Sequence, residues 1–259
     1  MNLQLISDKL LDPYLRDFPG GVFAAFSRLR NSEISTEEFD FHTASSSVYS
    51  CRIEGEDTDL KSYMQYRKSG KLDNVSKVDD LYSAYEFAQE NRISARNISE
   101  VHILLSKSFL EEQWRGKLRI QSVEVSAPDE IGNLKYTTAS PFGLEKEVRK
   151  LYADIKTLLD AHLSFEEVFY YASFIHLSFL KIHPWLDGNG RTARLLEKWF
   201  IAEKLGEKAW FLESEKMYFE HQKAYYQTLK DVGLEYENLN YDNALPFLEI
   251  LPQSVLAGI

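Results

Sequence analysis

Twelve consecutive residues, from His183 to Arg194, hold the groups in this chain that are best suited to chemistry. The segment reads His-Pro-Trp-Leu-Asp-Gly-Asn-Gly-Arg-Thr-Ala-Arg, so it combines an imidazole, a carboxylate, two glycines around an amide and two guanidinium groups. Apolar runs flank it at 170–182 and 195–201. We expect these runs to form buried helices that hold the polar loop rigidly, as is typical of functional loops.

Several groups in this loop suit the binding of an anion. Gly188 and Gly190 allow the backbone N–H groups around Asn189 to converge on an anion at the start of the next helix. Arg191 and Arg194 are three residues apart, so both can reach one polyphosphate from the same helix face. The spacing predicts a phosphate site with two cationic side chains.

Asp187 and His183 add metal binding and proton transfer. Asp187 offers a hard oxygen to Mg²⁺, which usually takes one or two protein carboxylates together with phosphate oxygens and waters. His183, with an ordinary pKa of about 6.5, can accept a proton near neutral pH. Each residue taken singly also fits an ordinary turn or a solvated helix face. Their ordered combination favours phosphoryl or nucleotidyl transfer.

The segment resembles the Fic-family signature, His-x-Phe-x-Asp/Glu-Gly-Asn-Gly-Arg-x-x-Arg, at every position except Trp185, which stands where the family has Phe. The resemblance implies a mainly α-helical Fic fold that transfers AMP from ATP to a protein hydroxyl. It makes His183 the base and Asp187 the Mg²⁺ ligand, while the glycine-rich turn and both arginines bind the nucleotide. Relatives that transfer phosphate tend to carry Lys at the first glycine, so Gly188 favours nucleotide transfer.

Residues 119–138 read as a β-hairpin, because short apolar stretches flank a turn-forming stretch at 128–133. The hairpin resembles the flap that Fic proteins place over the active site, where an exposed strand edge aligns the target protein. The resemblance directs Tyr136, Thr137 and Thr138 toward nucleotide and target. An ordinary two-stranded excursion is the alternative.

Tyr225 and Tyr226 lie in a helix predicted over about 214–230, and Fic proteins often show such a pair beside the adenine. Aromatic faces stack well on a base. The chain has 15 Tyr and 16 Phe, so packing in the core is the alternative. His176 also matches a common family histidine, but we interpret it as a hydrogen-bonded core residue.

A second informative stretch precedes the motif. A helix is predicted over about 39–55, since four apolar residues share one face: Phe41, Ala44, Val48 and Cys51. Gly55 is placed to end that helix in a left-handed conformation. Ser50, Glu54 and Gly55 resemble the family's inhibitory-helix signature, Ser/Thr-x-x-x-Glu-Gly/Asn. The resemblance implies that Glu54 pairs with Arg194 and keeps ATP from binding in line for attack. A solvated glutamate at a helix end is the alternative.

Composition is compatible with such an enzyme. The chain has 259 residues, 44% hydrophobic and 27% charged, which is typical of a globular protein. It has no apolar run of the length a membrane span needs, and its start does not resemble a secretion signal. Its single cysteine suits a reducing cytoplasm. The net charge of −10 argues against general nucleic-acid binding but not against ATP.

We expect one compact unit in three parts: an N-terminal helical region at 1–93, a Fic core at 94–204 and C-terminal helices at 205–259. Further helices are expected at about 97–111, at about 143–160, after a capping box of Ser164 and Glu167, and from the motif to about Gly206. A C-terminal apolar segment, 244–256, is expected to pack on the core or on a partner.

These observations lead to one hypothesis with two alternatives. The chain is expected to be a Mg²⁺-dependent protein adenylyltransferase, restrained by Glu54, that uses ATP to modify a Ser, Thr or Tyr hydroxyl of a protein docked along the flap. The sequence leaves open whether the chain modifies itself and whether it forms a homo-oligomer. The alternatives are Glu54-dependent removal of AMP from a modified protein, and a partner-binding regulatory protein with a vestigial nucleotide site.

Overall fold

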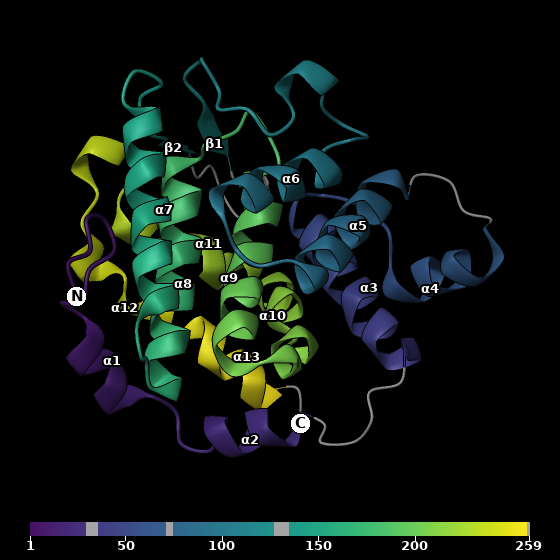
Figure 1. Cartoon of the computed structure of the whole chain (residues 1–259), viewed down its shortest axis with the longest axis horizontal. Coiled ribbons are helices and arrows are strands. Elements are labelled where there is room, and N and C mark those ends of the chain that lie inside the picture. The colour runs from purple at the N-terminus through teal and green to yellow at the C-terminus, as the bar shows by residue number, and fades with distance from the viewer. Residues whose placement is uncertain (30–35, 71–74, 127–134, 258–259) are drawn as a thin grey trace.

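The structure is a computed structural model that describes residues 1–29, 36–70, 75–126 and 135–257. Within these ranges the chain is mainly α-helical, and its strands form one two-stranded antiparallel sheet. The predicted fold class is confirmed: a helical bundle carries a β-hairpin at one end (Figure 1). None of the helices in the described ranges is long and apolar enough to cross a membrane.

Helix α8 (Phe165–Ile182) forms the centre of the bundle. Every residue from Val168 to Ile182 is buried, so the helix must be covered on all sides. The predicted capping box closes its first turn: Ser164 Oγ accepts the N–H of Glu167 at 3.2 Å, and Glu167 Oε2 accepts the N–H of Ser164 at 2.6 Å. The covering helices include α1 (Leu11–Asp17), α7 (Leu144–Asp160) and α9 (Asn189–Leu205).

Helices α5 (Ser76–Glu90) and α6 (Ala95–Leu105) pack on each other and on α9. The prediction of a helix over 97–111 is wrong at the C-terminal end, because α6 ends at Leu105. Ser106 Oγ donates to the carbonyl of His102 at 2.6 Å, and the chain then turns. The following loop contains the short helix η1 (Glu112–Trp114) and brings Phe109 to the motif segment.

Helix α3 (Thr36–Ile53) contacts α4 (Leu60–Ser69), α5, α9 and α10 (Ser214–Glu220). Gly55 has φ +94°, as the prediction of a left-handed helix end requires. Ala44, Val48 and Cys51 are buried, but Phe41 is 40% exposed, so the predicted apolar face reaches solvent near its start. α2 (Val22–Arg28) precedes α3 and lies at the end of the bundle opposite the hairpin (Figure 1).

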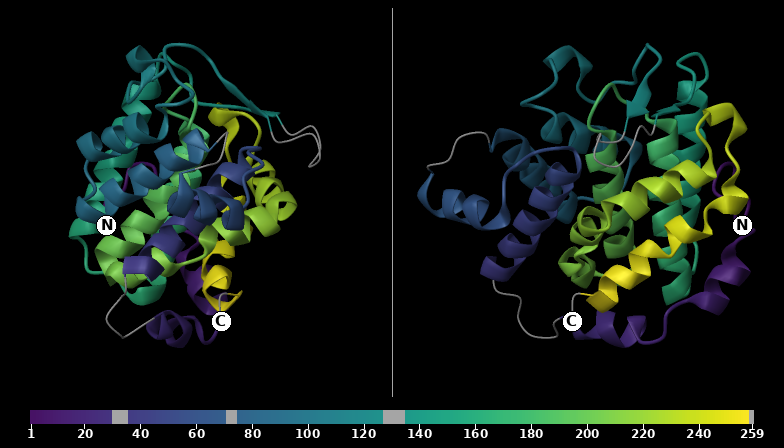
Figure 2. Two further views of the ribbon diagram at one scale, coloured as in Figure 1. Left: turned by 90° about the vertical axis from the view of Figure 1, so that its right-hand side faces the viewer. Right: turned by 180° about the vertical axis from the view of Figure 1, so that it is seen from behind.

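The helix predicted over 214–230 is two helices, α10 and α11 (Gln222–Val232), separated at His221. Figure 2 shows α11, α12 (Leu245–Leu248) and α13 (Ile250–Ala257) crossing the rear of the bundle. Leu251 is fully buried in α13, which packs against α2 and α10. The C-terminal apolar segment therefore packs on the core. Three short helices complete this region: η3 (Glu207–Phe211), η4 (Tyr236–Asn238) and η5 (Tyr241–Asn243).

The predicted hairpin is present, with strands β1 (Glu124–Ser126) and β2 (Lys135–Thr137). The strands are antiparallel, with Val125 opposite Tyr136. The turn predicted at 128–133 lies outside the described residues. The hairpin lies at the same end of the bundle as the loop between α8 and α9 (Figure 1).

Candidate functional site

The loop between α8 and α9 is held in one conformation by its own backbone and by Asn189. His183 ends α8 in the left-handed region, at φ 54° and ψ 64°, which is uncommon for a residue with a side chain. Asn189 Oδ1 accepts the N–H of Trp185 at 2.9 Å, and its Nδ2 donates to the Trp185 carbonyl at 2.8 Å. We expected the Asn189 side chain to bind nucleotide, but its hydrogen bonds to the Trp185 backbone stabilise the loop instead.

Gly188 provides the N-cap of α9 at φ +84°. A Cβ there would lie 2.9 Å from Leu105 Cδ1 and 3.3 Å from Phe109 Cζ, so a side chain would collide as well as strain the backbone. Thr192 makes the first hydrogen bond of the helix, from its N–H to the Gly188 carbonyl at 3.0 Å. The N–H groups before Thr192 thus have no partner within the helix and can bind an anion.

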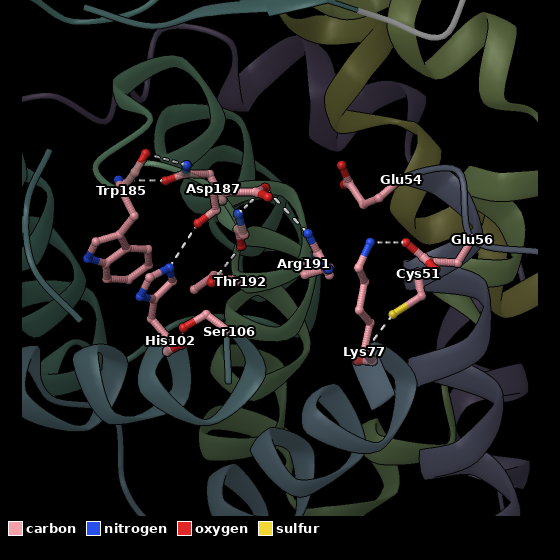
Figure 3. Close-up of polar contacts among 12 residues, drawn as sticks. Cys51, Glu54, Glu56, Lys77, His102, Ser106, Trp185, Asp187, Arg191 and Thr192 are labelled. Atoms are coloured by element: carbon pink, nitrogen blue, oxygen red, sulfur yellow. Dashed lines mark hydrogen bonds and ion pairs between the residues drawn. The ribbon is translucent and has the colours of Figure 1, made fainter. Parts of the chain in front are cut away.

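His102 supports this loop from α6, a role that the sequence did not indicate. Its Nδ1 accepts the N–H of Gly116 at 2.8 Å, so Nε2 carries the proton and donates to the Asp187 carbonyl at 2.9 Å. Burial lowers the pKa of His102 to about 4. Its ring stacks on Trp185, with centroids 4.2 Å apart. Trp185 is therefore a buried anchor, as expected of its position in the motif (Figure 3).

His183 is neutral at physiological pH. Burial, together with the nearby charge of Arg119, lowers its pKa to about 4, and the charge of Glu54 opposes part of that effect. Its Nδ1 is buried without a hydrogen-bond partner among the described residues. Arg119, a second residue that the sequence did not indicate, donates from Nε to the His183 carbonyl at 2.7 Å and also bonds to the Ala139 carbonyl after β2. His183 is thus uncharged, and Arg119 ties its backbone to the segment after β2.

Asp187 and Arg191 point toward each other near the start of α9, with Asp187 half-exposed and Arg191 buried (Figure 3). Asp187 Oδ1 accepts the Gly188 N–H at 2.5 Å, and Arg191 Nη2 lies 3.4 Å from the same oxygen. The Arg191 guanidinium lies 4.1 Å from the centroid of the Phe109 ring. Its Nε and Nη1 are buried and bond to nothing in the described part of the chain. A phosphate would satisfy such donors.

Asp187 fits a magnesium ion held jointly with a substrate. Its side chain is 54% exposed, and both of its hydrogen bonds described above go to Oδ1. The described residues contain no group of three or more His, Cys, Asp and Glu side chains that could hold a metal ion. Oδ2 of Asp187 is thus the carboxylate oxygen that a magnesium ion could take, alongside phosphate oxygens and water.

Arg194 joins α9 to α3. Its Nε donates to Ser50 Oγ at 2.8 Å, and its Nη2 donates to the Ser50 carbonyl at 3.0 Å and to Glu54 Oε1 at 2.6 Å. Burial by itself raises the pKa of Glu54, but the charges of Arg194 and Arg191 outweigh burial and keep that pKa below its usual value. Glu54 is therefore an ionised carboxylate with 29% of its side chain exposed.

Glu54 lies directly over the first turn of α9. A Cβ placed on Gly190 would be 2.2 Å from Glu54 Oε1 and 3.2 Å from Arg194 Nη1. After Gly55, Glu56 forms an ion pair with Lys77 at the start of α5, at 2.5 Å (Figure 3). The structure thus brings Ser50, Glu54 and the motif together, as the sequence predicted.

The predicted aromatic residues lie at different depths. Tyr136 is buried on the inner side of β2, with Lys181 Nζ 4.4 Å from its ring centroid. Tyr225 is 1% exposed, and its hydroxyl lies 3.0 Å from Nε2 of the buried His176. Tyr226 is 9% exposed, and burial, followed by the charge of Glu54, raises its pKa. Tyr225 is thus packed in the core, and contact of Tyr225 and Tyr226 with the base stays a prediction.

His176 lies in the core, as we interpreted it. Its Nδ1 is 2.8 Å from Glu197 Oε2, which also accepts the Tyr218 hydroxyl at 2.8 Å. Both His176 and Glu197 are fully buried. This network links α8, α9 and α10 beneath the site and leaves His176 away from solvent.

The two edges of the flap differ. The outer edge of β2 is occupied, because the N–H of Thr137 donates to the Leu234 carbonyl at 2.7 Å. Thr138 Oγ1 donates to the Val123 carbonyl at 2.8 Å and is buried, while Thr137 faces solvent. Among the described residues, β1 pairs with β2 on one side only, whereas both edges of β2 are occupied by the same chain.

The fold and the site together define a helical protein in which α9 begins at a left-handed glycine N-cap beside a neutral histidine. Residues 92–201 match the Fic/DOC family model. The matched segment contains the hairpin, α7, α8 and the motif loop, so this part of the chain is similar to the Fic/DOC family. No curated protein matches the chain.

Solved structures of Fic proteins have the same fold. A Fic family protein from Desulfovibrio desulfuricans G20 superposes with a TM-score of 0.76 at 17% identity, covering 100% of this chain and 75% of its own. A Fic domain containing signaling protein from Bacteroides thetaiotaomicron VPI-5482 gives 0.70 at 16%, covering 92% and 93%. Fic-1 from C. elegans gives 0.64 at 17%, covering 96% and 72%. The predicted Fic fold is confirmed.

Proposed function

We propose that the chain is a protein adenylyltransferase that moves AMP from ATP to a protein hydroxyl and is restrained by Glu54. One observation carries the proposal: a neutral imidazole, His183, lies beside a helix start where the buried donors Arg191 Nε and Nη1 have no partner in the described ranges. An anionic substrate would satisfy those donors and bring its phosphorus within reach of a hydroxyl that His183 can deprotonate.

The proposed step conserves atoms and charge. The target hydroxyl loses its proton to His183, and its oxygen forms a bond to the α-phosphorus of ATP. The bond from that phosphorus to the oxygen bridging the α- and β-phosphates breaks, and pyrophosphate leaves. We assign Nε2 of His183 to take the proton, with the buried Nδ1 carrying the hydrogen of the neutral ring. Asp187 would hold Mg²⁺, which would neutralise phosphate charge.

We place the base of ATP and the target segment from the residues around the site. Tyr136 and Tyr226, which border the region of Glu54, would contact the base. The target segment would lie along β1, because Leu234 closes the edge of β2. A target able to present an extended, exposed segment suits this edge.

Glu54 would restrain the enzyme by occupying the phosphate position. Its carboxylate lies where a Cβ on Gly190 would be, and it occupies a donor of Arg194 that would otherwise bind phosphate. A hundredfold reduction in rate requires a bias of only about 2.7 kcal/mol. One partly buried ion pair can supply a bias of that size. A modest change in the position of α3 would therefore be enough to activate the enzyme.

Transfer of label from α-³²P-ATP tests the proposal. Glu54→Gly should increase labelling of the chain itself or of a lysate protein, and His183→Ala in that background should abolish it. Glu56→Gly is the matched control, since it removes a nearby carboxylate that pairs with Lys77 and not with the motif. Equal labelling with and without His183 would refute its role as the base.

Removal of AMP is a second candidate, favoured by the ionised state of Glu54. An ionised carboxylate near His183 could orient and activate a water molecule to attack an AMP-modified side chain. Release of AMP from a modified protein would then require Glu54 and disappear in Glu54→Gly. Release that is unchanged by this substitution would exclude Glu54 from such a reaction.

A further inference from the structure

α3 and α9 share a second buried polar contact, one helical turn beyond the Arg194 site. Lys198 Nζ on α9 donates to Ser46 Oγ on α3 at 2.6 Å, to the Leu212 carbonyl at 2.6 Å and to Glu215 Oε2 at 2.5 Å. The hydroxyl of Tyr85 donates to Glu215 Oε1 at 2.6 Å. The Lys198 and Glu215 side chains are each 1% exposed.

The two contacts together define the register between the helices. Ser46, Ser50 and Glu54 follow one another at intervals of four residues, as do Arg194 and Lys198, so each set lines one helix face. Arg194 bonds to Ser50 and Glu54 near the end of α3. Lys198, one turn further along α9, bonds to Ser46, one turn closer to the start of α3. α9 therefore holds α3 at two levels, about one turn apart.

Breaking the hydrogen bond between Lys198 and Ser46 affects its two partners differently. If α3 moves away, Lys198 keeps Glu215 and the Leu212 carbonyl, so no buried charge is left unpaired. Ser46 loses its partner but can be hydrated. The contact with Ser46 thus stabilises the position of α3 without making its departure prohibitive.

We propose that the hydrogen bond between Ser46 and Lys198 is a positioning contact that sets how firmly α3 keeps Glu54 over the motif. Neither residue touches the phosphate position described above, so the contact acts through the helix. This inference rests on the proposed restraint by Glu54. It extends the control of the site to a buried cluster shared by α3, α5, α9 and α10.

The test compares Ser46→Ala with Ser47→Ala. Ser47 is also buried on α3, but its Oγ donates to Thr43 of the same helix at 2.8 Å. Ser46→Ala should raise adenylylation by about tenfold, the effect of losing one hydrogen bond to a charged group. Ser47→Ala should leave it near the starting level. In the Glu54→Gly background, Ser46→Ala should change nothing. With Glu54 present, Ser46→Thr, which keeps a hydroxyl for Lys198, should keep the restraint that Ser46→Ala loses.

Hydrogen exchange provides a readout that does not require activity. Ser46→Ala should speed amide exchange in α3, relative to Ser47→Ala, while the melting temperatures of the two variants stay similar. Unchanged exchange and unchanged activity would overturn the inference. An equal gain of activity with and without Glu54 would also overturn it. If Glu54→Gly is inactive but α3 exchanges faster in Ser46→Ala, the proposed function fails and the positioning role stands.

Discussion

At the residue scale, the two histidines near the motif loop, His102 and His183, are both uncharged, and burial is the largest cause for each. His102 is neutral because it is buried, and its tautomer is fixed because Gly116 donates to one nitrogen and Asp187 accepts from the other. His183 is neutral because burial and Arg119 both disfavour the imidazolium. The first holds the loop, and the second is available as a base.

The pKa of His183 predicts the pH dependence of the activated enzyme. A base acts when neutral, so activity should fall only as the pH approaches the lowered value, about 4. In Glu54→Gly, loss of the carboxylate that raises this pKa should extend activity further into acid. Initial rates between pH 5.5 and 7.5 should vary little, whereas an ordinary histidine would cost about tenfold at the acid end. A midpoint near 6.5 would contradict the assignment.

Gly190→Ala tests the phosphate position. A methyl group there would collide with Glu54 Oε1 and fill the space assigned to phosphate. In the Glu54→Gly background, we expect calorimetry to show at least about tenfold weaker ATP binding. Stability should change by less than about 1 kcal/mol, because Ala is the better helix former. Unchanged affinity would mean that the nucleotide binds elsewhere.

The motif was predictable residue by residue because its groups are adjacent in sequence and each offset has a chemical reason. Phe109, His102 and Arg119 were not predictable, since nothing in their local sequence marks them. Phe109 meets Arg191, and His102 meets Asp187, only because the loop after α6 folds over the motif. Their roles come from tertiary contacts.

At the element scale, Arg119 connects the flap to the end of α8. Its guanidinium donates to the carbonyls of His183, Gln121 and Ala139 and is 3% exposed. The hairpin is therefore anchored at its base. This element was predictable as a hairpin, but the closure of β2 by Leu234 was not, because these residues are distant in sequence.

Arg119→Met should destabilise the fold and lower activity together. Four carbonyls, including that of Ile182 at 3.3 Å, would lose a charged donor, at a cost of about 2 to 4 kcal/mol, measured by urea unfolding. In the Glu54→Gly background the rate should also fall, because the backbone of His183 loses its support. Arg149→Met is the control, since that side chain is 77% exposed and its pair with Glu145 should contribute less than about 1 kcal/mol. Equal effects of the two substitutions would rule out the anchor.

Helix ends were harder to predict than helices. The capping box at Ser164 and the stop near Gly206 depend on local residue types, and both were predicted. The end of α6 and the break at His221 were not predicted, because the helical pattern continues through both points. Side-chain hydrogen bonds back to the helix, from Ser106 and from His221, accompany these turns.

At the scale of the whole molecule, both ends of the chain are fastened to the bundle. Asp154 of α7 accepts the N–H groups of Gln4, Leu5 and Ile6 at 2.7 to 2.9 Å. α13 packs against α2, α8 and α10. The sequence showed that 244–256 is apolar but could not decide between the core and a partner, since both bury the same side chains.

Leu251→Ala should therefore behave as a core substitution. Leu251 is fully buried, and loss of its side chain should cost about 2 to 5 kcal/mol in thermal or urea unfolding. Leu256→Ala on the same helix is the control, because Leu256 is 37% exposed and its loss should cost less than about 1 kcal/mol. Similar small effects from both would indicate that α13 detaches easily.

The buried thiol of Cys51 offers a natural reporter of this regulation. The chain has a single cysteine, it lies in α3 three residues before Glu54, and burial raises its pKa to about 12. While α3 is seated, the sulfur is shielded and protonated, so electrophiles cannot modify it. The rate at which a maleimide dye reacts with Cys51 of the unaltered protein would therefore report how often α3 moves away from the bundle, without an engineered label.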